Sequence, residues 1–202
     1  MNLKTLIPKS EARKTVINRR GNFNSADLKT KTKIIIDRLA ASDDFIHARR
    51  IHTYISTRPG EMDTRLLVDL MCSHGKNIVI PKLNKQAKKF QHANFNGWDN
   101  LIKNNDGYIE PPTALDEDLS DIDLMIVPAV AVSPLGHRIG YGGGYYDRLL
   151  RSVSAVKVVP AFEYQLVENI FTDIHDIRVD RIVTELRIIS TKEPSKRITE
   201  LL

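Results

Sequence analysis

The chain has 202 residues, 42% of them hydrophobic and 27% charged, and its formal net charge is +5 at pH 7. This composition is that of a soluble globular protein, and the length fits one domain over residues 1–202 whose core needs no disulfide. One cysteine excludes an intrachain disulfide, residues 1–14 contain no apolar signal segment, and no apolar run is long enough to span a bilayer. We therefore expect a cytoplasmic protein that does not contact membranes.

The N-terminal half predicts three helices and two strands. The predicted helices span residues 9–20, 25–41 and 63–74, and the predicted strands span 50–56 and 77–83. Asn24 or Ser25 caps the second helix, and Gly75 ends the third. Cys72 lies on an apolar stretch of the third helix, so we expect a buried core thiol. His52 is expected at the surface or partly buried.

The C-terminal half begins with a polar, turn-rich stretch over residues 84–120, with short strands expected near Phe90 and Tyr108. Trp98 in this stretch is predicted to be a local packing anchor. The predicted strands beyond it span 122–129, 155–162 and 181–189, and the predicted helices span 145–153 and 165–170. Strands that alternate with helices favour an α/β fold with a mostly parallel sheet. The strongly apolar strand 122–129 is expected at the centre of that sheet.

The most informative segment is His137–Arg148, which contains four glycines, three tyrosines, two arginines and one aspartate. Glycines let backbone N–H groups approach a ligand closely, and the start of the helix that follows suits phosphate. Arg138 and Arg148 can add charge-assisted hydrogen bonds. Asp147 offers a hard oxygen ligand for a magnesium ion that bridges phosphates, and the tyrosines offer flat faces for a ring. These residues indicate a nucleotide-phosphate site beside an aromatic-lined pocket.

Two common phosphate-binding motifs are excluded for this segment. No Gly-Lys-Ser/Thr follows the glycines, as a Walker A loop requires, and the order Gly-x-Gly-Gly-Gly does not fit the dinucleotide fingerprint. The alternative without function is a tight strand-to-helix turn with surface tyrosines, although an ordinary turn needs only one or two glycines. The segment follows the predicted central strand, and ligands of open α/β sheets bind beyond the carboxyl ends of the strands.

Several segments, taken in order, make the chain resemble the 5-formyltetrahydrofolate cyclo-ligase family, also called 5,10-methenyltetrahydrofolate synthetases. The resemblance extends from about residue 9 to Glu185, and its most specific segment is Gly140–Arg148. The other matching segments are individually weak but keep their order: Lys9–Arg13, Pro59–Thr64, Asp106–Pro111, Val127–Pro128, Glu163–Gln165 and His175–Asp176. The chain departs from the family at Val132–Leu135, where members often carry Phe-Asp shortly before the Gly-x-Arg.

The resemblance implies a three-layer αβα fold and a ring closure that depends on ATP and magnesium. ATP would phosphorylate the N-formyl oxygen of 5-formyltetrahydrofolate, which is otherwise a poor leaving group. The neighbouring amine would then close the ring to 5,10-methenyltetrahydrofolate, with release of ADP and phosphate. Such phosphoryl transfer depends mainly on positioning and charge stabilisation, so no protein nucleophile is required. The implied partners are ATP, Mg²⁺ and 5-formyltetrahydrofolate, with or without a polyglutamate tail, bound by a monomer.

The resemblance also implies roles for individual residues. The implied ATP-binding residues are Lys9, Arg13, Arg138, Ile139, Gly140, Tyr141, Gly142, Gly143, Gly144, Tyr145 and Tyr146. The implied folate-binding residues are Ile55, Glu61, Tyr141, Gly142, Gly143, Gly144 and Tyr145. Asp147 and Asp176 would lie at the magnesium ion, and Arg138 and Tyr145 would be catalytic. His175 has no second histidine at ligand spacing, which favours a structural role.

Plainer interpretations and two other functions stay open. Taken alone, Lys9 and Arg13 indicate a solvated basic helix face, and Glu61 and Asp176 indicate turn residues. A non-catalytic folate- or nucleotide-binding relative is one alternative, although the set formed by Lys9, Arg13, Arg138, Tyr145 and Asp147 is intact. A basic nucleic-acid-binding protein is the other, but the chain shows no helix-turn-helix, zinc finger or aromatic-basic RNA-binding signature. We therefore expect only weak, non-specific binding to nucleic acid.

Overall fold

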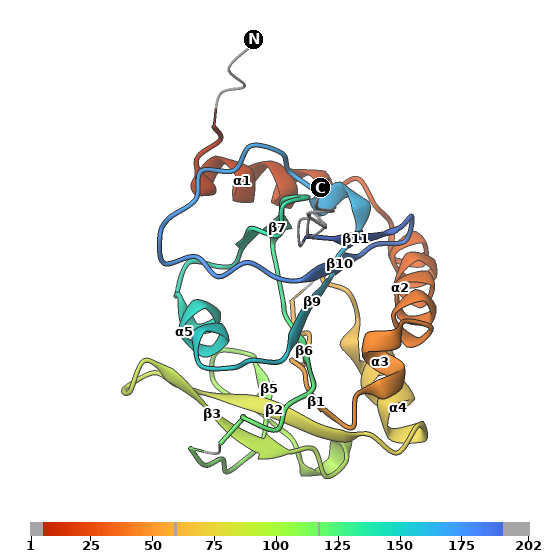
Figure 1. The fold of residues 1–202 in the computed structure, drawn as a ribbon, viewed down its shortest axis with the longest axis vertical. Helices are drawn as coiled ribbons and strands as arrows, with labels where there is room; N and C mark the ends of the chain where they lie inside the picture. The colour runs from red at the N-terminus through yellow and green to blue at the C-terminus, as the bar shows by residue number, and fades with distance from the viewer. Residues whose placement is uncertain (1–5, 59, 117, 192–202) are drawn as a thin grey trace, which may run out of the picture.

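A seven-stranded sheet forms the middle of the computed structural model, which describes residues 6–58, 60–116 and 118–191 (Figure 1). Its strands are β1 (Arg50–His52), β2 (Asn77–Asn84), β3 (Lys89–Asn94), β6 (Leu124–Ile126), β9 (Val156–Pro160), β10 (Arg181–Val183) and β11 (Ile188–Ser190). The order across the sheet is β11-β10-β9-β6-β1-β2-β3. Strands β10 to β2 run parallel, whereas β3 and β11 pair antiparallel at the two edges.

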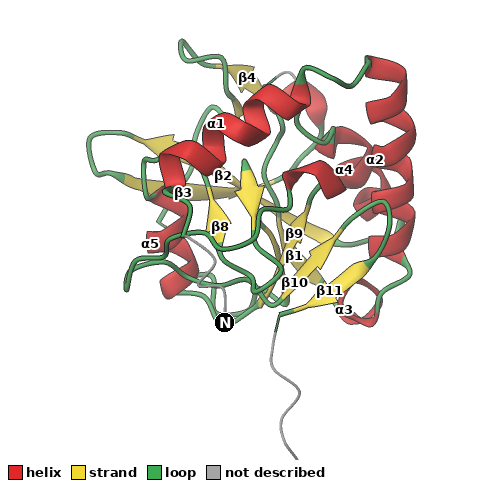
Figure 2. Cartoon of the chain, turned by 90° about the horizontal axis from the view of Figure 1, so that it is seen from above, coloured by secondary structure: helices red, strands yellow, loops and turns green. Residues whose placement is uncertain are grey.

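Helices cover both faces of this sheet, so the predicted three-layer α/β fold is confirmed (Figures 1 and 2). The helices α2 (Ser25–Ala40), α3 (Asp43–His47) and α4 (Thr64–Ser73) cover one face, and α5 (Tyr145–Arg151) covers the other. The remaining helix is α1 (Lys9–Arg20), and there are 3-10 turns η1 (Trp98–Asn100) and η2 (Glu163–Gln165). The Asn24 side chain accepts a hydrogen bond from the backbone N–H of Asp27 across 2.8 Å, which confirms one of the two predicted caps of α2. Asp63 caps α4 in the same way.

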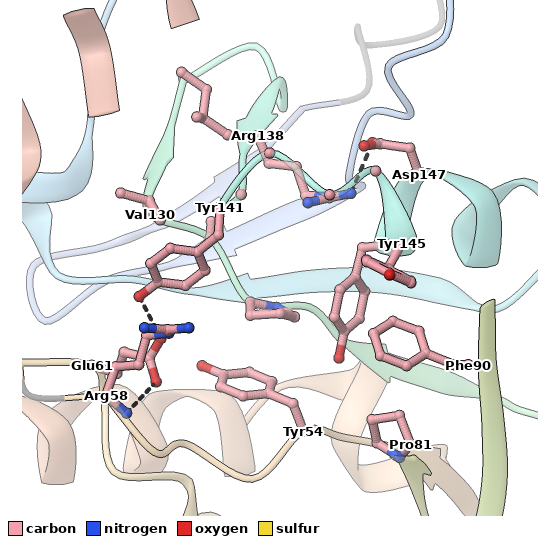
Figure 3. Close-up of a pocket in the computed structure, with 18 of the residues that line it drawn as sticks. Tyr54, Arg58, Glu61, Pro81, Phe90, Val130, Arg138, Tyr141, Tyr145 and Asp147 are labelled. Atoms are coloured by element: carbon pink, nitrogen blue, oxygen red, sulfur yellow. Dashed lines mark hydrogen bonds and ion pairs between the residues drawn. The ribbon is translucent and has the colours of Figure 1, made fainter. Parts of the chain in front are cut away.

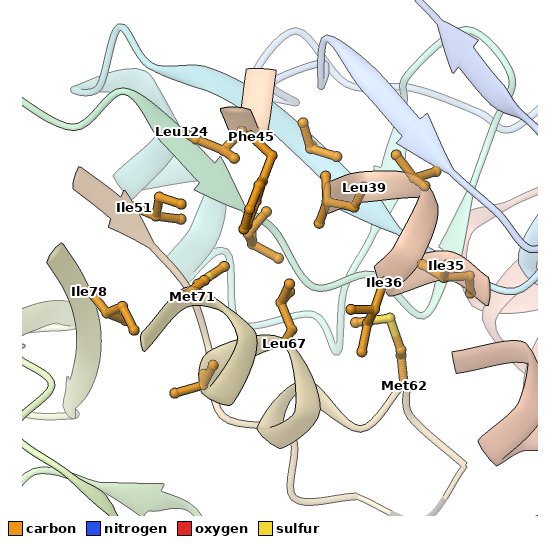
Figure 4. Close-up of a cluster of buried hydrophobic side chains, with 14 of the residues drawn as sticks. Ile35, Ile36, Leu39, Phe45, Ile51, Met62, Leu67, Met71, Ile78 and Leu124 are labelled. Atoms are coloured by element: carbon orange, nitrogen blue, oxygen red, sulfur yellow. The ribbon is translucent and has the colours of Figure 1, made fainter. Parts of the chain in front are cut away.

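The alternation of side chains along β6 divides the core between the two faces of the sheet. Leu124 and Ile126 belong to the cluster packed by α2, α3 and α4 (Figure 4), whereas Met125 belongs to the cluster packed by α5. All three side chains are fully buried, because both faces of a central parallel strand are covered. A register shift of one residue would exchange the two sets. The predicted central strand is thus confirmed in position, although it is shorter than 122–129.

A third, smaller apolar cluster holds α1 across one end of the sheet (Figure 1). Ala12 and Val16 of α1 are fully buried and pack against Val130 and Ile139. These partners lie in or beside a hairpin formed by β7 (Ala131–Val132) and β8 (Arg138–Ile139). The hairpin follows β6 and leads into the glycine loop (Gly140–Gly144), which joins β8 to α5. Helix α1 is therefore held next to the glycine loop. A second short pair consists of β4 (Ile102–Lys103) and β5 (Ile109–Glu110).

Two predicted elements are wrong. The strand predicted over 181–189 is two strands, because the Thr184 hydroxyl accepts two backbone N–H groups from the residues after it and turns the chain back on itself. The helix predicted over 165–170 is only the turn η2. The backbone N–H of Val167 donates to the carbonyl of Val132 instead, which holds the chain extended beside β7. The β7–β8 hairpin and α3 have no counterpart among the predicted elements.

Two predicted burial states are wrong, and one is confirmed. Cys72 is exposed, because Met71 occupies the buried face of α4 and the next residue is turned about 100° away from it. His52 is fully buried, because β1 lies inside the sheet and is covered on both faces. Trp98 is the expected packing anchor, and its ring centroid lies 4.9 Å from that of Phe95.

Within the described ranges, no helix has the length and apolar character needed to cross a membrane. Residues 1–5, 59, 117 and 192–202 lie outside these ranges. They include Pro59 of one matching segment and both ends of the expected domain. The single domain over residues 1–202 stays a prediction.

Candidate active site

A cavity of about 780 Å³ opens at the carboxyl ends of the central strands (Figure 3). Its walls come from α1, the turn after β1, the β2–β3 hairpin, the glycine loop and residues 173–176. Every predicted site residue lines this cavity: Lys9, Arg13, Ile55, Glu61, Arg138, Ile139, Gly140, Tyr141, Gly142, Gly143, Gly144, Tyr145, Tyr146, Asp147 and Asp176. The fold thus brings together residues from both ends of the chain, while their individual roles stay predictions.

Two basic residues of α1 reach the cavity from one side. Lys9 and Arg13 are four residues apart, so they share one face of the helix. Arg13 Nε donates a hydrogen bond to the carbonyl oxygen of Gly140 across 3.0 Å. This bond ties α1 to the first residue of the glycine loop, so the helix and the loop are held together at the cavity.

The ammonium of Lys9 is paired with a carboxylate at the edge of the cavity. Lys9 Nζ lies 2.5 Å from Oδ1 of Asp176, and the other oxygen of Asp176 accepts the backbone N–H of Asp173 across 2.8 Å. Burial by itself would raise the pKa of Asp176, but the Asp173 N–H and the Lys9 ammonium outweigh it and lower that pKa. Asp176 is therefore an oriented anion at neutral pH.

Arg138 places a buried cation at the base of the cavity. Its side chain is 4% exposed, and Nη2 donates to Oδ1 of Asp147 across 2.8 Å (Figure 3). Burial lowers the pKa of Arg138, although Asp147 opposes the effect and a guanidinium stays protonated in proteins. Within the described chain, Arg138 Nε and the Tyr146 hydroxyl are buried without a hydrogen-bond partner. Such orphaned donors are rare, and here they favour a site that is completed by a bound group.

The glycine loop exposes main-chain atoms without side chains next to the basic residues of the cavity. Gly142 and Gly144 have φ angles of 104° and 65°, which lie in the left-handed region that favours glycine. A Cβ atom on Gly143 would lie 2.7 Å from the Tyr145 ring. The loop is therefore shaped so that its main chain is open to a ligand and Tyr145 folds against it.

Two aromatic rings form an apolar wall. The Tyr145 and Phe90 ring centroids are 5.6 Å apart, and both rings lie on one side of the cavity (Figure 3). The guanidinium of Arg148 lies 4.9 Å from the Tyr145 ring centroid, and its Nε donates to the carbonyl of Lys88 across 2.9 Å. Arg148 thus joins the glycine-loop side of the cavity to the β2–β3 turn and supports the Tyr145 ring. The wall presents a flat surface that suits a planar ligand.

The opposite wall is polar and centres on Glu61. The Tyr141 hydroxyl donates to Oε1 of Glu61 across 2.8 Å, and Oε2 accepts the backbone N–H groups of Thr57 and Arg58 across 3.2 and 3.1 Å. The Arg58 guanidinium lies 4.5 Å from the Tyr141 ring centroid. Burial, followed by the nearby Glu61 carboxylate, raises the pKa of Tyr141 to about 12. Tyr141 is therefore a neutral donor that holds the carboxylate in place.

Sequence reasoning misses several lining residues. They include Tyr54, Arg58, Phe90, Tyr108 and Asp173. No pattern in the sequence places the β2–β3 hairpin against the glycine loop, so Phe90 has no local signal. Tyr108 lies inside the matching segment Asp106–Pro111, and that segment could have identified it as a cavity residue.

The described residues contain no group of three or more His, Cys, Asp or Glu side chains arranged for a metal ion. The two predicted metal residues, Asp147 and Asp176, instead each face a cation of the same cavity. Both carboxylates act electrostatically on Arg138, which lies near them. His175 lines the cavity as well, and its backbone carbonyl accepts a hydrogen bond from Arg151. Its expected structural role stays a prediction.

The departure from the family pattern falls outside the cavity lining. Val132 pairs with Arg138 in the β7–β8 hairpin, and the Ser133 hydroxyl accepts the backbone N–H of His137 across 3.2 Å. All residues of Val132–Leu135 are described, and none of them lines the cavity. The departure therefore changes the turn of a supporting hairpin, while the walls of the cavity come from other residues.

A model of the 5-formyltetrahydrofolate cyclo-ligase family matches residues 7–185 of this chain. The 5-formyltetrahydrofolate cyclo-ligase of Escherichia coli K12 is 32% identical to it over 135 residues, which cover 64% of this chain and 74% of that protein. A probable 5-formyltetrahydrofolate cyclo-ligase of Caenorhabditis elegans is 26% identical over 191 residues, with coverage of 88% and 92%.

Solved structures of methenyltetrahydrofolate synthetases are also similar to this chain. The NMR structure of Aquifex aeolicus 5,10-methenyltetrahydrofolate synthetase matches with a TM-score of 0.80 at 29% identity, and the match covers 92% of this chain and 94% of that one. The 5,10-methenyltetrahydrofolate synthetase of Mycoplasma pneumoniae, at 19% identity and a TM-score of 0.67, shares the fold. The family match includes α1, the glycine loop and most of the cavity between them. The chain therefore belongs to the 5-formyltetrahydrofolate cyclo-ligase family.

Proposed function

We propose that the protein converts 5-formyltetrahydrofolate to 5,10-methenyltetrahydrofolate in a reaction that consumes ATP and requires Mg²⁺. The observation that carries this proposal is the composition of one cavity. Lysine, arginines and a bare glycine backbone lie at one end, and aromatic rings and an oriented carboxylate lie on its walls. A nucleotide triphosphate and a planar, donor-bearing ring need these two environments side by side.

The chemistry requires activation of the formyl oxygen, which cannot leave from carbon unaided. Transfer of the γ-phosphoryl group of ATP to this oxygen releases ADP and makes the oxygen part of a phosphate leaving group. The neighbouring secondary amine of the folate then attacks the formyl carbon and closes the ring. Its proton passes to solvent or to the departing phosphate, and the carbon–oxygen bond breaks with loss of phosphate to leave the methenyl cation. Each step needs positioned substrates and compensated charge, and none needs a nucleophile from the protein.

Lys9, Arg13 and Arg138 are the residues we assign to the phosphates. Arg138 is held in place by Asp147 and is largely shielded from water, so its charge acts strongly on nearby groups. Arg13 is oriented by its bond to Gly140. A guanidinium with further free donors matches phosphate oxygens well. These three cations would compensate the charge that develops during phosphoryl transfer.

Asp147 and Asp176 are the residues we assign to Mg²⁺. Magnesium in nucleotide sites uses one or two carboxylates, with the remaining positions filled by water and phosphate oxygens, so a pair of carboxylates near the phosphate-binding cations fits. When bound, the ion would neutralise phosphate charge. The protein's own contribution is that Lys9 and Arg138 pair with the two carboxylates and orient them.

Glu61 and the aromatic wall are assigned to the folate. A carboxylate has about four acceptor positions, so Glu61 keeps about one for an N–H of a pterin beside its three present donors. Ile55 is buried and lines the same cavity, so it adds apolar surface. Tyr145 stands where the folate wall meets the glycine loop, so we assign it to the reacting end of the folate.

An absorbance assay tests the proposal, because the methenyl product has its own absorption band. Purified protein is mixed with 5-formyltetrahydrofolate, ATP and Mg²⁺, and the band should appear only when all three are present. The Arg138→Ala variant should form product far more slowly than wild type. Binding of both ligands without product would support a non-catalytic relative, and failure to bind either ligand would overturn the assignment of the cavity.

A further inference from the structure

Helix α1 contacts the glycine loop at two consecutive residues from positions two turns apart. Arg13 binds the carbonyl of Gly140. Arg20, the last residue of α1, forms a side-chain hydrogen bond with Tyr141. The first of these contacts lies at the end of the cavity assigned to phosphate, and the second lies at the wall that contains Glu61. One helix therefore supports the phosphate end of the cavity and the wall that contains Glu61.

The side chain of Arg20 is enclosed by groups from three segments. Besides Tyr141, it forms a hydrogen bond with Tyr164, whose hydroxyl donates to the carbonyl of Gly60 across 3.3 Å. The aliphatic part of Arg20 lies against Gly60, because a Cβ atom on that glycine would fall 2.3 Å from Arg20 Cδ. Gly60 immediately precedes Glu61. Arg20 thus supports the turn that carries the carboxylate as well as the tyrosine that donates to it.

These contacts form a short chain with a fixed direction. The guanidinium has only donors, so the Tyr141 oxygen must accept from Arg20 while its own hydrogen is donated to Oε1 of Glu61. A hydroxyl that accepts from a cation becomes a stronger donor to an anion, so the two bonds reinforce each other. Tyr141 needs this support, because the residue is 47% exposed. Its ring also lies against the guanidinium of Arg58.

We infer that Arg20 is a positioning residue for folate binding, which acts through Tyr141 and the Gly60 turn to orient the Glu61 carboxylate toward the substrate. Arg20 does not line the cavity and touches no reacting atom. The inference rests on the proposed function, because it takes Glu61 as the acceptor for the folate. It predicts that two arginines of the same helix have separable effects, with Arg13 acting on ATP and Arg20 acting on the folate.

The experiment measures folate binding by calorimetry in the absence of ATP, and kinetic constants for both substrates by product absorbance. Arg20→Ala should weaken the affinity for 5-formyltetrahydrofolate about tenfold, which is the effect of one lost charge-assisted contact. The KM for ATP should stay within about twofold of wild type. Arg20→Lys should recover part of the affinity, because an ammonium can still donate to the phenol but cannot bridge two tyrosines with a planar fork.

Arg19→Ala is the matched control. It removes the same charge from the same helical turn, and the bonds of Arg19 within the described ranges go to the backbone carbonyls of Tyr164 and Leu166. Its folate affinity should equal that of wild type. Equal losses in the Arg19 and Arg20 variants would reveal an effect of net charge or of helix stability, and would overturn the inference.

A double-mutant cycle tests whether the effect passes through the tyrosine. In the Tyr141→Phe background the phenol oxygen is absent, so Arg20→Ala should cost clearly less folate affinity than it costs in wild type. Additive losses would mean that Arg20 acts by another route. If wild type binds the folate and forms product while Arg20→Ala does so with unchanged constants, the inference fails and the proposed function stands. If wild type neither binds nor reacts, the proposed function itself fails.

Discussion

The ammonium of Lys9 lies 2.5 Å from Oδ1 of Asp176, although 167 positions separate the two residues in the chain. A cation assigned to phosphate and a carboxylate assigned to magnesium are thus paired with each other. Ligand binding would have to redistribute these charges, since neither residue can serve its ligand fully while it neutralises the other.

Asp176→Asn should therefore change the affinity for ATP differently in the presence and in the absence of Mg²⁺. The amide keeps the shape of the side chain but removes the charge that attracts Lys9, so ATP without Mg²⁺ should bind more tightly than to wild type. The dependence of turnover on Mg²⁺ should weaken at the same time. ATP titrations by calorimetry, with Mg²⁺ or with a chelator, measure both effects. A magnesium dependence identical to that of wild type would remove Asp176 from the metal site.

Asp147→Ala should lose activity with magnesium-ATP and also lose stability. Its carboxylate is the partner of the buried Arg138, so truncation removes the counter-ion of a buried cation, at a cost of about 3–5 kcal/mol. Asp147→Asn separates the two effects, because the amide oxygen still accepts from Arg138. The asparagine variant should melt close to wild type yet require more Mg²⁺. Unchanged turnover and magnesium dependence in both variants would exclude the metal role.

Arg13→Ala should weaken the binding of ATP more than it weakens the binding of the folate. The guanidinium is held at Gly140 by one hydrogen bond, which leaves its other donors for phosphate oxygens. The expected loss is about 1.5–3 kcal/mol of ATP binding free energy. Lys14→Ala is the control, since that residue is exposed and does not line the cavity. A defect confined to the folate constant would reverse the assignment.

Substitutions of Tyr145 should separate the role of its ring from that of its hydroxyl. Tyr145→Ala removes the ring that packs with Phe90 and under Arg148, and we expect a large loss of turnover. Tyr145→Phe keeps these contacts, so a smaller but measurable loss would report the hydroxyl acting near the transition state. Melting temperatures measured beside the kinetics identify any loss due to packing. A stable alanine variant with wild-type constants would remove Tyr145 from the site.

The buried pair of His52 and His92 should make the fold sensitive to acid. Their ring centroids are 5.3 Å apart. Burial, followed by the charge of His92, lowers the pKa of His52 to about 3, and burial lowers that of His92 to about 4. The unfolded chain takes up these protons near its ordinary pKa of about 6.5, whereas the folded state resists them. The stability contributed by the neutral pair is therefore fully present above about pH 6.5 and is lost as the pH decreases toward about 4 for His92 and about 3 for His52.

His52→Phe should reduce this loss. A phenyl ring keeps the aromatic volume and cannot be protonated, and neither nitrogen of His52 has a hydrogen-bond partner in the described part of the chain. Each proton taken up on unfolding contributes about 1.4 kcal/mol per pH unit, so the difference should be clear by pH 5. Urea unfolding at pH 7 and pH 5 measures it, with the exposed His47→Phe as control. Parallel pH profiles for wild type and His52→Phe would contradict the burial argument.

Local patterns predict the elements whose reasons are local. Helix α1 has the predicted bounds of residues 9–20, Asn24 caps α2 as one of two expected residues, and the apolar β6 lies at the centre of the sheet. The wrong elements depend on partners that are distant in the chain. The helix expected over 165–170 does not form, because Leu166 bridges Val132. No local pattern at either residue indicates this pairing.

The site shows the same division. The unusual composition of the glycine loop predicts that it belongs to the site. Individually weak motifs that keep the order of the family predict that α1 and Glu61 belong to it as well. The interactions that give these residues their properties are set by packing. Nothing local indicates that Arg138 would be buried with Asp147, or that Tyr141 would join Glu61 to Arg20. The sequence alone can therefore predict which residues belong to the site. The fold determines which residues compensate their charges.

Helix α1 rests on the smallest of the three apolar clusters, with Ala12 and Val16 as its only fully buried anchors among the described residues. Such a segment can detach at a lower free energy than the central sheet. A ligand that contacts both α1 and the glycine loop would stabilise the docked helix and suppress this local opening. Amide hydrogen exchange in residues 9–20 should then slow markedly with ATP, while the amides of β6 stay equally protected with and without it.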